Sequence, residues 1–131
     1  IKIGVDLSEL IVPGAGWQSI SCIDQIQVSL GHMLADMATE VEAARTLMWR
    51  AAALVAEGKP ALREISMAKL YASEVYVKVA QHGMQVMGGY GYNAEFDMER
   101  YLRDSRAATV AAGTSQIQKN VIANLMGFKV T

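Results

Sequence analysis

Apolar residues recur at alternating steps of three and four along the first half of this chain, and this spacing constrains the fold more than any other feature. The set runs from Ile23 to Val55 and comprises Ile23, Ile26, Leu30, Met33, Met37, Val41, Ala44, Met48, Ala51 and Val55. Because an α-helix turns once in 3.6 residues, the spacing places them on one face of a single long helix. Gly58, suited to a left-handed cap, and Pro60, which cannot continue a helix, predict its end.

A second helical run follows and ends at the glycine pair Gly88 and Gly89. Its apolar face is formed by Ile65, Ala68, Ala72, Val75, Val79 and Val86. Glu74 and Lys78 lie one turn apart, which predicts an ion pair within the helix. Only a few residues around Pro60 separate the two runs, so the helices are expected to be antiparallel neighbours in a hairpin.

Two shorter helices are predicted after the glycine pair. Asp97 can cap the first, while Ser115 and Gln118 form a capping box that opens the second, which Gly127 can end. No stretch shows sustained strand-like alternation. We therefore predict an all-α fold, an antiparallel, up-and-down helical bundle. The heptad-like stripes leave an extended coiled coil as an alternative, although the short connection and abundant alanine favour the compact bundle.

The chain divides into two parts by pattern. Residues 1–19 contain Pro13, Gly14 and Gly16 and have no clear period, so they are predicted to be an irregular segment. Residues 20–131 are predicted to form one helical bundle domain. A chain of 131 residues suits a single domain, because it can bury roughly two-thirds of its unfolded surface.

Charge and composition argue against several classes of function. The formal net charge is −1 and no run of lysine or arginine occurs, which argues against nucleic acid as a partner. No apolar stretch approaches the ~20 residues that cross a bilayer, so no membrane span is predicted. The single Cys22 cannot form an internal disulfide and fits a reducing compartment. Neither His32 nor His82 has a partner at a zinc-ligand spacing, so no metal site is predicted.

Several motifs appear in the order and approximate spacing of a known family. They are Ala35–Arg45, Met67–Glu74, Gln85–Tyr92, Met98–Asp104 and Gly113–Gln118. Together they closely resemble the C-terminal domain of acyl-CoA dehydrogenases, over about Leu34 to Met126. The resemblance implies an antiparallel helical bundle of this type, here without its first helix. It also implies a homo-oligomer, dimer or tetramer, or a partner subunit that carries the missing domains.

The same resemblance implies FAD as the cofactor and an acyl-CoA thioester as the substrate. Its FAD-contacting positions correspond here to Gln85, Gly88, Gly89, Thr114 and Gln116. The first three would approach the ADP part of an FAD held by a neighbouring subunit, where glycine lets the backbone come close to a phosphate. The last two lie at the start of a helix, whose free amides suit an anion.

The resemblance further implies that Gly113 lies next to the acyl thioester and that a carboxylate base acts nearby. In most members this base is a glutamate directly before the Gly-Thr pair, but here Ala112 stands there, and a methyl group cannot accept a proton. Members resembling isovaleryl-CoA dehydrogenase also have alanine there and take their glutamate from an earlier helix, which this chain lacks. No catalytic residue is therefore assigned.

The sequence predicts the C-terminal portion of an FAD-dependent acyl-CoA dehydrogenase, an oxidoreductase of fatty acid metabolism that is inactive without its other domains. The alternatives are a non-catalytic helical oligomerisation module built on the same fold, or part of a related acyl-CoA oxidase or flavin monooxygenase. The expected compartment is the bacterial cytoplasm or the mitochondrial matrix, with the cytoplasm favoured.

Overall fold

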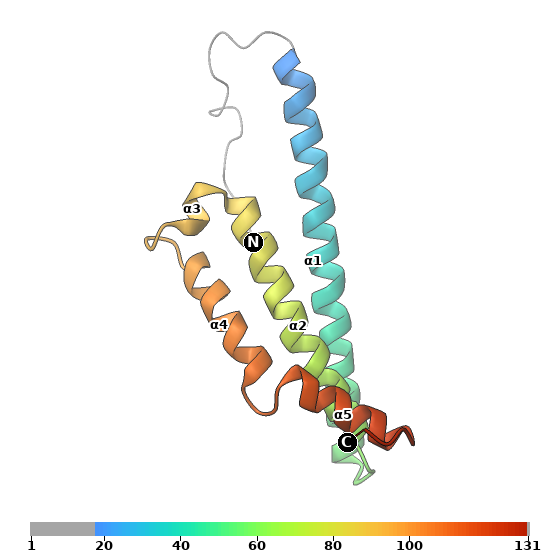
Figure 1. The fold of residues 1–131 in the computed structure, drawn as a ribbon. Coiled ribbons are helices and arrows are strands. Elements are labelled where there is room, and N and C mark those ends of the chain that lie inside the picture. The colour runs from blue at the N-terminus through green and yellow to red at the C-terminus, as the bar shows by residue number, and fades with distance from the viewer. Residues whose placement is uncertain (1–17, 131) are drawn as a thin grey trace. The chain divides into compact units, whose positions relative to one another are not determined.

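The computed structural model describes residues 18–130 and places the side chains from Ile26 to Val130. Within these residues five helices follow one another and no strand occurs, which confirms the predicted all-α class (Figure 1). The helices are α1 (Gln18–Ala56), α2 (Leu62–Met87), α3 (Gly89–Tyr92), α4 (Met98–Val110) and α5 (Ser115–Leu125). The predicted irregular segment 1–19 lies outside the described residues except for Gln18 and Ser19, which belong to α1. The chain divides into two compact units within α1, between His32 and Met33, and helices α2 to α5 belong to the unit that begins at Met33.

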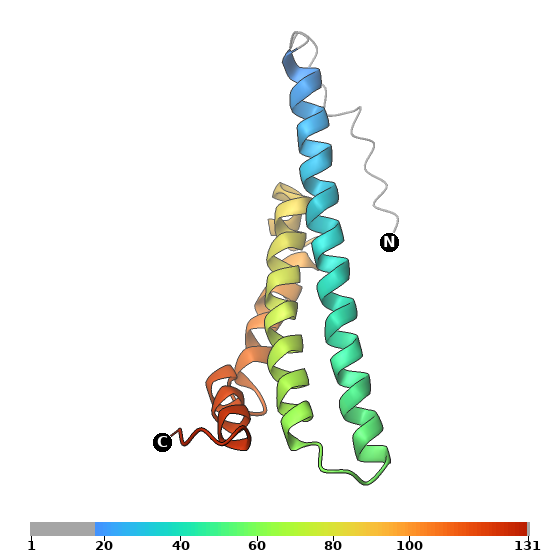
Figure 2. The same cartoon turned by 90° about the vertical axis from the view of Figure 1, so that its right-hand side faces the viewer.

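Helices α1 and α2 form the predicted antiparallel hairpin (Figure 2). The link between them turns at Gly58, whose φ of +69° is the left-handed conformation expected of a glycine cap. The side of α1 that faces α2 is marked by its less exposed residues, which recur at steps of four and three: Met33, Met37, Glu40, Ala44, Leu47, Ala51 and Leu54. Glu40 shows that this side of α1 faces α2, because its carboxylate accepts a hydrogen bond from Lys78 of α2.

A second line of apolar residues on α1 is left uncovered. Leu34, Val41, Met48 and Val55 recur every seven residues and are 42%, 39%, 51% and 55% exposed; we call them the outer row. Val41, Met48 and Val55 belong to the apolar face predicted for this helix, and the structure covers only part of that face. A stripe at steps of three and four spans about 100° of the helix surface, and α2 covers only one side of it.

The predicted ion pair between Glu74 and Lys78 is also wrong. Lys78 instead pairs with Glu40 of α1, and Glu74 lies 3.5 Å from the Lys119 ammonium of α5, so both side chains reach neighbouring helices. The hydrogen bond to Glu40 raises the pKa of Lys78 above its ordinary value of 10.5. A raised pKa in the folded state means that this pair contributes to stability at neutral pH, and that its contribution is lost as the pH rises through the raised value.

Helix α2 is the common support of the later helices. It packs against α3, α4 and α5, while α4 and α5 make their main contacts with α2 (Figure 1). The buried residues of α2 are small, namely Ser66, Ala68, Ser73, Val75 and Ala80. Ser105 of α4 is 0% exposed and is the largest fully buried side chain among residues 26–130. The core is therefore a close approach of helix backbones over small residues, without a centre of large side chains.

The helix caps differ from the predicted ones in detail. Asp97 precedes α4, but its side chain makes no capping hydrogen bond and instead pairs with Arg100 at 3.1 Å. Helix α5 is capped by Thr114 and not by Ser115, which is already helical and buried. Gly127, with a φ of +93°, follows the end of α5 as predicted.

Candidate functional site

The glycine turn at the end of α2, defined here as Gln85–Tyr90, presents open backbone. Gly88 has a φ of +55°, and its amide donates to the Gln85 carbonyl at 3.2 Å. A methyl group built on Gly88 or Gly89 would meet nothing within 4 Å, so both residues leave free space in front of the main chain. The structure brings Gln85, Gly88 and Gly89 together on one exposed surface. Their role in FAD contact remains a prediction.

The link between α4 and α5, Ala111–Thr114, contains two successive residues with positive φ. Ala112 has a φ of +54° and Gly113 a φ of +88°. The left-handed region is unfavourable for an alanine, whose Cβ crowds the following carbonyl. Two side chains reach this link: Lys69 Nζ donates to the Gly113 carbonyl at 2.7 Å, and Gln118 Nε2 donates to the Ala112 carbonyl at 3.2 Å.

The first turn of α5 begins directly after this link. Thr114 has extended backbone angles, and its Oγ1 accepts a hydrogen bond from the Ile117 amide at 3.3 Å. The remaining first-turn amides have no partner within the helix, so they give this end of α5 a partial positive charge. Gln116 lies on the exposed side of the same turn. The structure thus brings Ala112, Gly113, Thr114 and Gln116 together.

Removal of the Thr114 cap gives a first testable result. We expect Thr114→Ala to lower the free energy of unfolding by about 1 kcal/mol, because the Ile117 amide loses its acceptor. Thr109→Ala is the matched control, since the Thr109 hydroxyl bonds to the Arg106 carbonyl within α4 and caps nothing. Urea denaturation measures both. Equal destabilisation by the two variants would show that the Thr114 cap contributes no more to the free energy of unfolding than an ordinary hydroxyl bond within a helix.

The two groups of predicted residues lie at opposite ends of α2 (Figure 1). Gly113 is held by Lys69, near the beginning of α2, and Lys69 precedes Gly88 by nineteen residues. At a rise of 1.5 Å per residue, this separation is about 28 Å along the helix axis. A single copy of the chain therefore does not bring the glycine turn and the start of α5 to one cleft.

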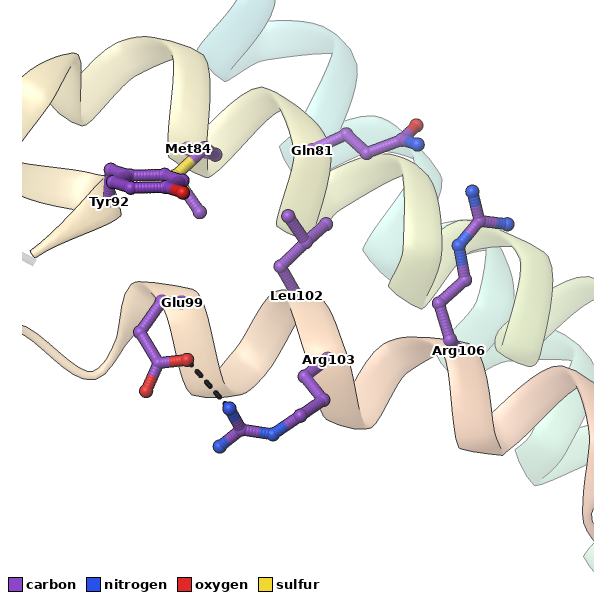
Figure 3. Close-up of a pocket in the computed structure, with 7 residues that line it drawn as sticks. All are labelled: Gln81, Met84, Tyr92, Glu99, Leu102, Arg103 and Arg106. Carbon is purple, nitrogen blue, oxygen red and sulfur yellow. Dashed lines mark hydrogen bonds and ion pairs between the residues drawn. The ribbon is translucent and has the colours of Figure 1, made fainter. Parts of the chain in front are cut away.

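A shallow groove between α2 and α4 was not predicted from the sequence. Its lining residues are Gln81, Met84, Tyr92, Glu99, Leu102, Arg103 and Arg106 (Figure 3). Leu102 and Arg106 extend from α4 towards α2, whereas Glu99 and Arg103 extend away and pair with each other at 2.8 Å. This pair is an ion pair within α4, between residues four apart. The sequence offered one sign of this groove. Its lining residues on α2 and on α4 are spaced three or four apart, so that they lie on one side of each helix.

Comparison with known proteins explains the pattern of motifs. Residues 27–127 match the model of the family described as acyl-CoA dehydrogenase, C-terminal domain. The chain belongs to the acyl-CoA dehydrogenase family. Among similar proteins, subunit CarC of the caffeyl-CoA reductase-Etf complex of Acetobacterium woodii is 45% identical over 98 residues, which are 75% of this chain and 26% of CarC.

Solved structures of the acyl-CoA dehydrogenase fold show the same arrangement of helices. Butyryl-CoA dehydrogenase from Megasphaera elsdenii superposes with a TM-score of 0.72 and 32% identity, over 96% of this chain and 28% of the enzyme. The FAD complex of PigA superposes with a TM-score of 0.74 and 30% identity, over 76% of this chain and 26% of PigA. The chain thus spans about a quarter of the length of the proteins that it matches.

The described residues contain neither a membrane-spanning helix nor a cluster of metal ligands. None of their helices is both long and apolar enough to cross a membrane. No group of three or more His, Cys, Asp and Glu side chains in this part of the chain could hold a metal ion.

Proposed function

We propose that this chain supplies the C-terminal helical portion of an FAD-dependent acyl-CoA dehydrogenase, with contacts to FAD and an interface between subunits. The match over residues 27–127 supports the proposal, and so does the similarity to a protein solved with FAD. The proposed substrate is an acyl-CoA thioester, and FAD held beside these residues would supply the hydride acceptor. The rest of the active site comes from parts of the protein that the relatives carry outside this quarter of their length.

The described residues fit such a cofactor at both predicted places. The free space in front of Gly88 and Gly89 lets a phosphate approach the main chain, which a side chain at either position would obstruct. At the start of α5, the free amides and the positive end of the helix favour an anionic group beside Thr114 and Gln116.

The distance of about 28 Å between these places supports an FAD shared between two copies of the chain. In this arrangement the start of α5 in one copy and the glycine turn of another face the same cofactor. The site is then incomplete in a monomer, so cofactor binding and self-association depend on each other.

The chain itself does not supply a base at the position where most acyl-CoA dehydrogenases carry one. The Ala112 side chain has no group that accepts a proton, and its carbonyl accepts a hydrogen bond from Gln118 of α5. Glu40 is engaged by Lys78, and Glu42 lies 3.2 Å from Arg45, on a helix that contributes nothing to the link. The chain alone is accordingly expected to be inactive towards acyl-CoA.

Titration of the chain with FAD tests the proposal. Uptake of one FAD per chain, followed by the visible flavin absorbance, is the expected result. Gly88→Ala should weaken binding about tenfold, because the added methyl group fills the space in front of the turn. Gly58→Ala is the matched control: it has a similar positive φ and the same free space, but lies in the α1–α2 link. Equal loss of binding in both variants would assign the effect to folding.

A non-catalytic helical module is the second candidate, and Ala112 favours it, because the described residues offer no proton acceptor beside the Gly-Thr pair. The same titration separates the two candidates. A chain that takes up no FAD but still self-associates would support the module and overturn the flavoprotein proposal.

Self-association is proposed to use the outer row of α1. Its four residues are spaced like one side of a helix–helix seam, and they are exposed although each is apolar. We further place the chain in the bacterial cytoplasm or the mitochondrial matrix, with the cytoplasm favoured. The single cysteine, which cannot form an internal disulfide, supports a reducing compartment.

A further inference from the structure

The link between α4 and α5 adopts a conformation that its own sequence does not favour. Ala112 is the only residue other than glycine with a positive φ in the described part of the chain. Gly113 follows with a positive φ of its own, and Thr114 then returns to an extended conformation. A residue held in an unfavourable region persists only when its surroundings determine it, so something outside residues 111–114 must fix this link.

Two side chains from two helices meet that requirement. Lys69 of α2 donates to the Gly113 carbonyl at 2.7 Å, and Gln118 of α5 donates to the Ala112 carbonyl at 3.2 Å. Gln118 also lies directly over Gly113, since a methyl group built on that glycine would stand 2.8 Å from Gln118 Nε2. Successive carbonyls of the link are therefore each held by a side-chain donor.

Lys69 is the stronger of the two. Its bond is charge-assisted, partly buried and joins residues 44 apart in sequence, whereas the Gln118 bond is exposed and local. Among the described residues no carboxylate pairs with Lys69, so the Gly113 carbonyl is the partner that the structure gives to this ammonium group. A half-buried lysine bound to a main-chain carbonyl fixes the position of the backbone at that point.

We propose that Lys69 and Gln118 form a backbone clamp and that Lys69 is a positioning residue for the cofactor site. The clamp holds Ala112 and Gly113 in the left-handed region, and this turns the first amides of α5 towards the ligand. The inference rests on the proposed function in one respect, namely that the ligand at the start of α5 is FAD. The proposal adds Lys69 of α2 to the cofactor site. Lys69 touches neither FAD nor substrate, but it orients the first amides of α5, which contact the ligand.

Lys69→Met tests the clamp, because it removes the donor and keeps the length of the side chain. Hydrogen–deuterium exchange of the full chain is expected to accelerate about tenfold at the amides of Ile117 and Gln118, which donate to the Thr114 hydroxyl and carbonyl, with no change in the middle of α2. The dissociation constant of FAD should rise about tenfold in the same variant. Lys69→Arg, which keeps a charged donor, should restore most of both properties. Lys59→Met is the matched control, since Lys59 forms an exposed pair with Glu57.

The two measurements distinguish failure of the clamp from failure of the proposed function. Unchanged exchange at the amides of Ile117 and Gln118 in folded Lys69→Met overturns the clamp. If that variant does not fold, Lys69→Gln, whose side chain is shorter and uncharged, takes its place, and unchanged exchange in that variant overturns the clamp equally. Faster exchange with an unchanged FAD dissociation constant overturns the positioning role of Lys69. A wild-type chain that takes up no FAD overturns the proposed function and the positioning role together, whereas exchange still decides the clamp.

Discussion

Replacement of both Val41 and Met48 by glutamate is expected to convert the self-associated chain into a monomer at micromolar concentration. Both residues belong to the outer row, and burial of each large apolar side chain in an interface contributes about 1.5–3 kcal/mol. The variant loses this contribution and adds charges that would have to be buried. Since about 1.4 kcal/mol corresponds to a factor of ten, the dissociation constant should rise by at least roughly a hundredfold.

Light scattering coupled to gel filtration measures the effect. Thr39→Glu with Thr46→Glu is the matched control: it adds the same charges at the same spacing on α1, at exposed positions whose hydroxyls bond only within the helix. The control is expected to remain associated. A wild-type chain that elutes as a monomer contradicts self-association. A Val41→Glu, Met48→Glu variant that remains associated shows that the interface does not use the outer row.

The second large effect is expected at Ser105. Ser105→Leu should lower the free energy of unfolding by about 2–3 kcal/mol, because the side chain is 0% exposed and the interface of α4 with α2 has no room for three more carbons. For a domain of this size the melting temperature should fall by roughly 10 °C. Thermal denaturation followed by circular dichroism measures the change.

Ser105→Ala is the control for volume. It removes the hydrogen bond from Ser105 Oγ to the Leu102 carbonyl, at 2.7 Å, but leaves the packing unchanged, so its effect should stay within about 1 kcal/mol. Leucine tolerated as well as alanine would mean that α2 and α4 are not in close contact at this position.

The sequence predicts the helices well because their signals are local. Steps of three and four define α1 and α2, and Gly58 and Gly88 end them through a conformation that glycine adopts easily. The outer row could not be identified as uncovered from the sequence, because periodicity gives the width of an apolar face but not which part of it has a neighbour. Similarly, Glu74 and Lys78 satisfy the rule for a local pair, but each finds a partner on another helix.

The candidate site could be predicted only in part. Gly88 and Thr114 belong to motifs, so the resemblance to acyl-CoA dehydrogenases identified them. The positive φ of Ala112 has no signal in the sequence, because alanine is ordinarily a helix former. Lys69 lies within a motif, but its bond to Gly113 joins residues 44 apart and depends on how α5 packs on α2.

Helix α2 connects the two candidate ligand contacts, the glycine turn and the α4–α5 link. The glycine turn continues one end of α2, and the α4–α5 link is tied to the other end through Lys69. Because α3, α4 and α5 all pack on α2, local opening of this helix releases both contacts in one cooperative step. We therefore expect a ligand bound at either end to favour the closed form of the whole helix and to raise the affinity at the other end.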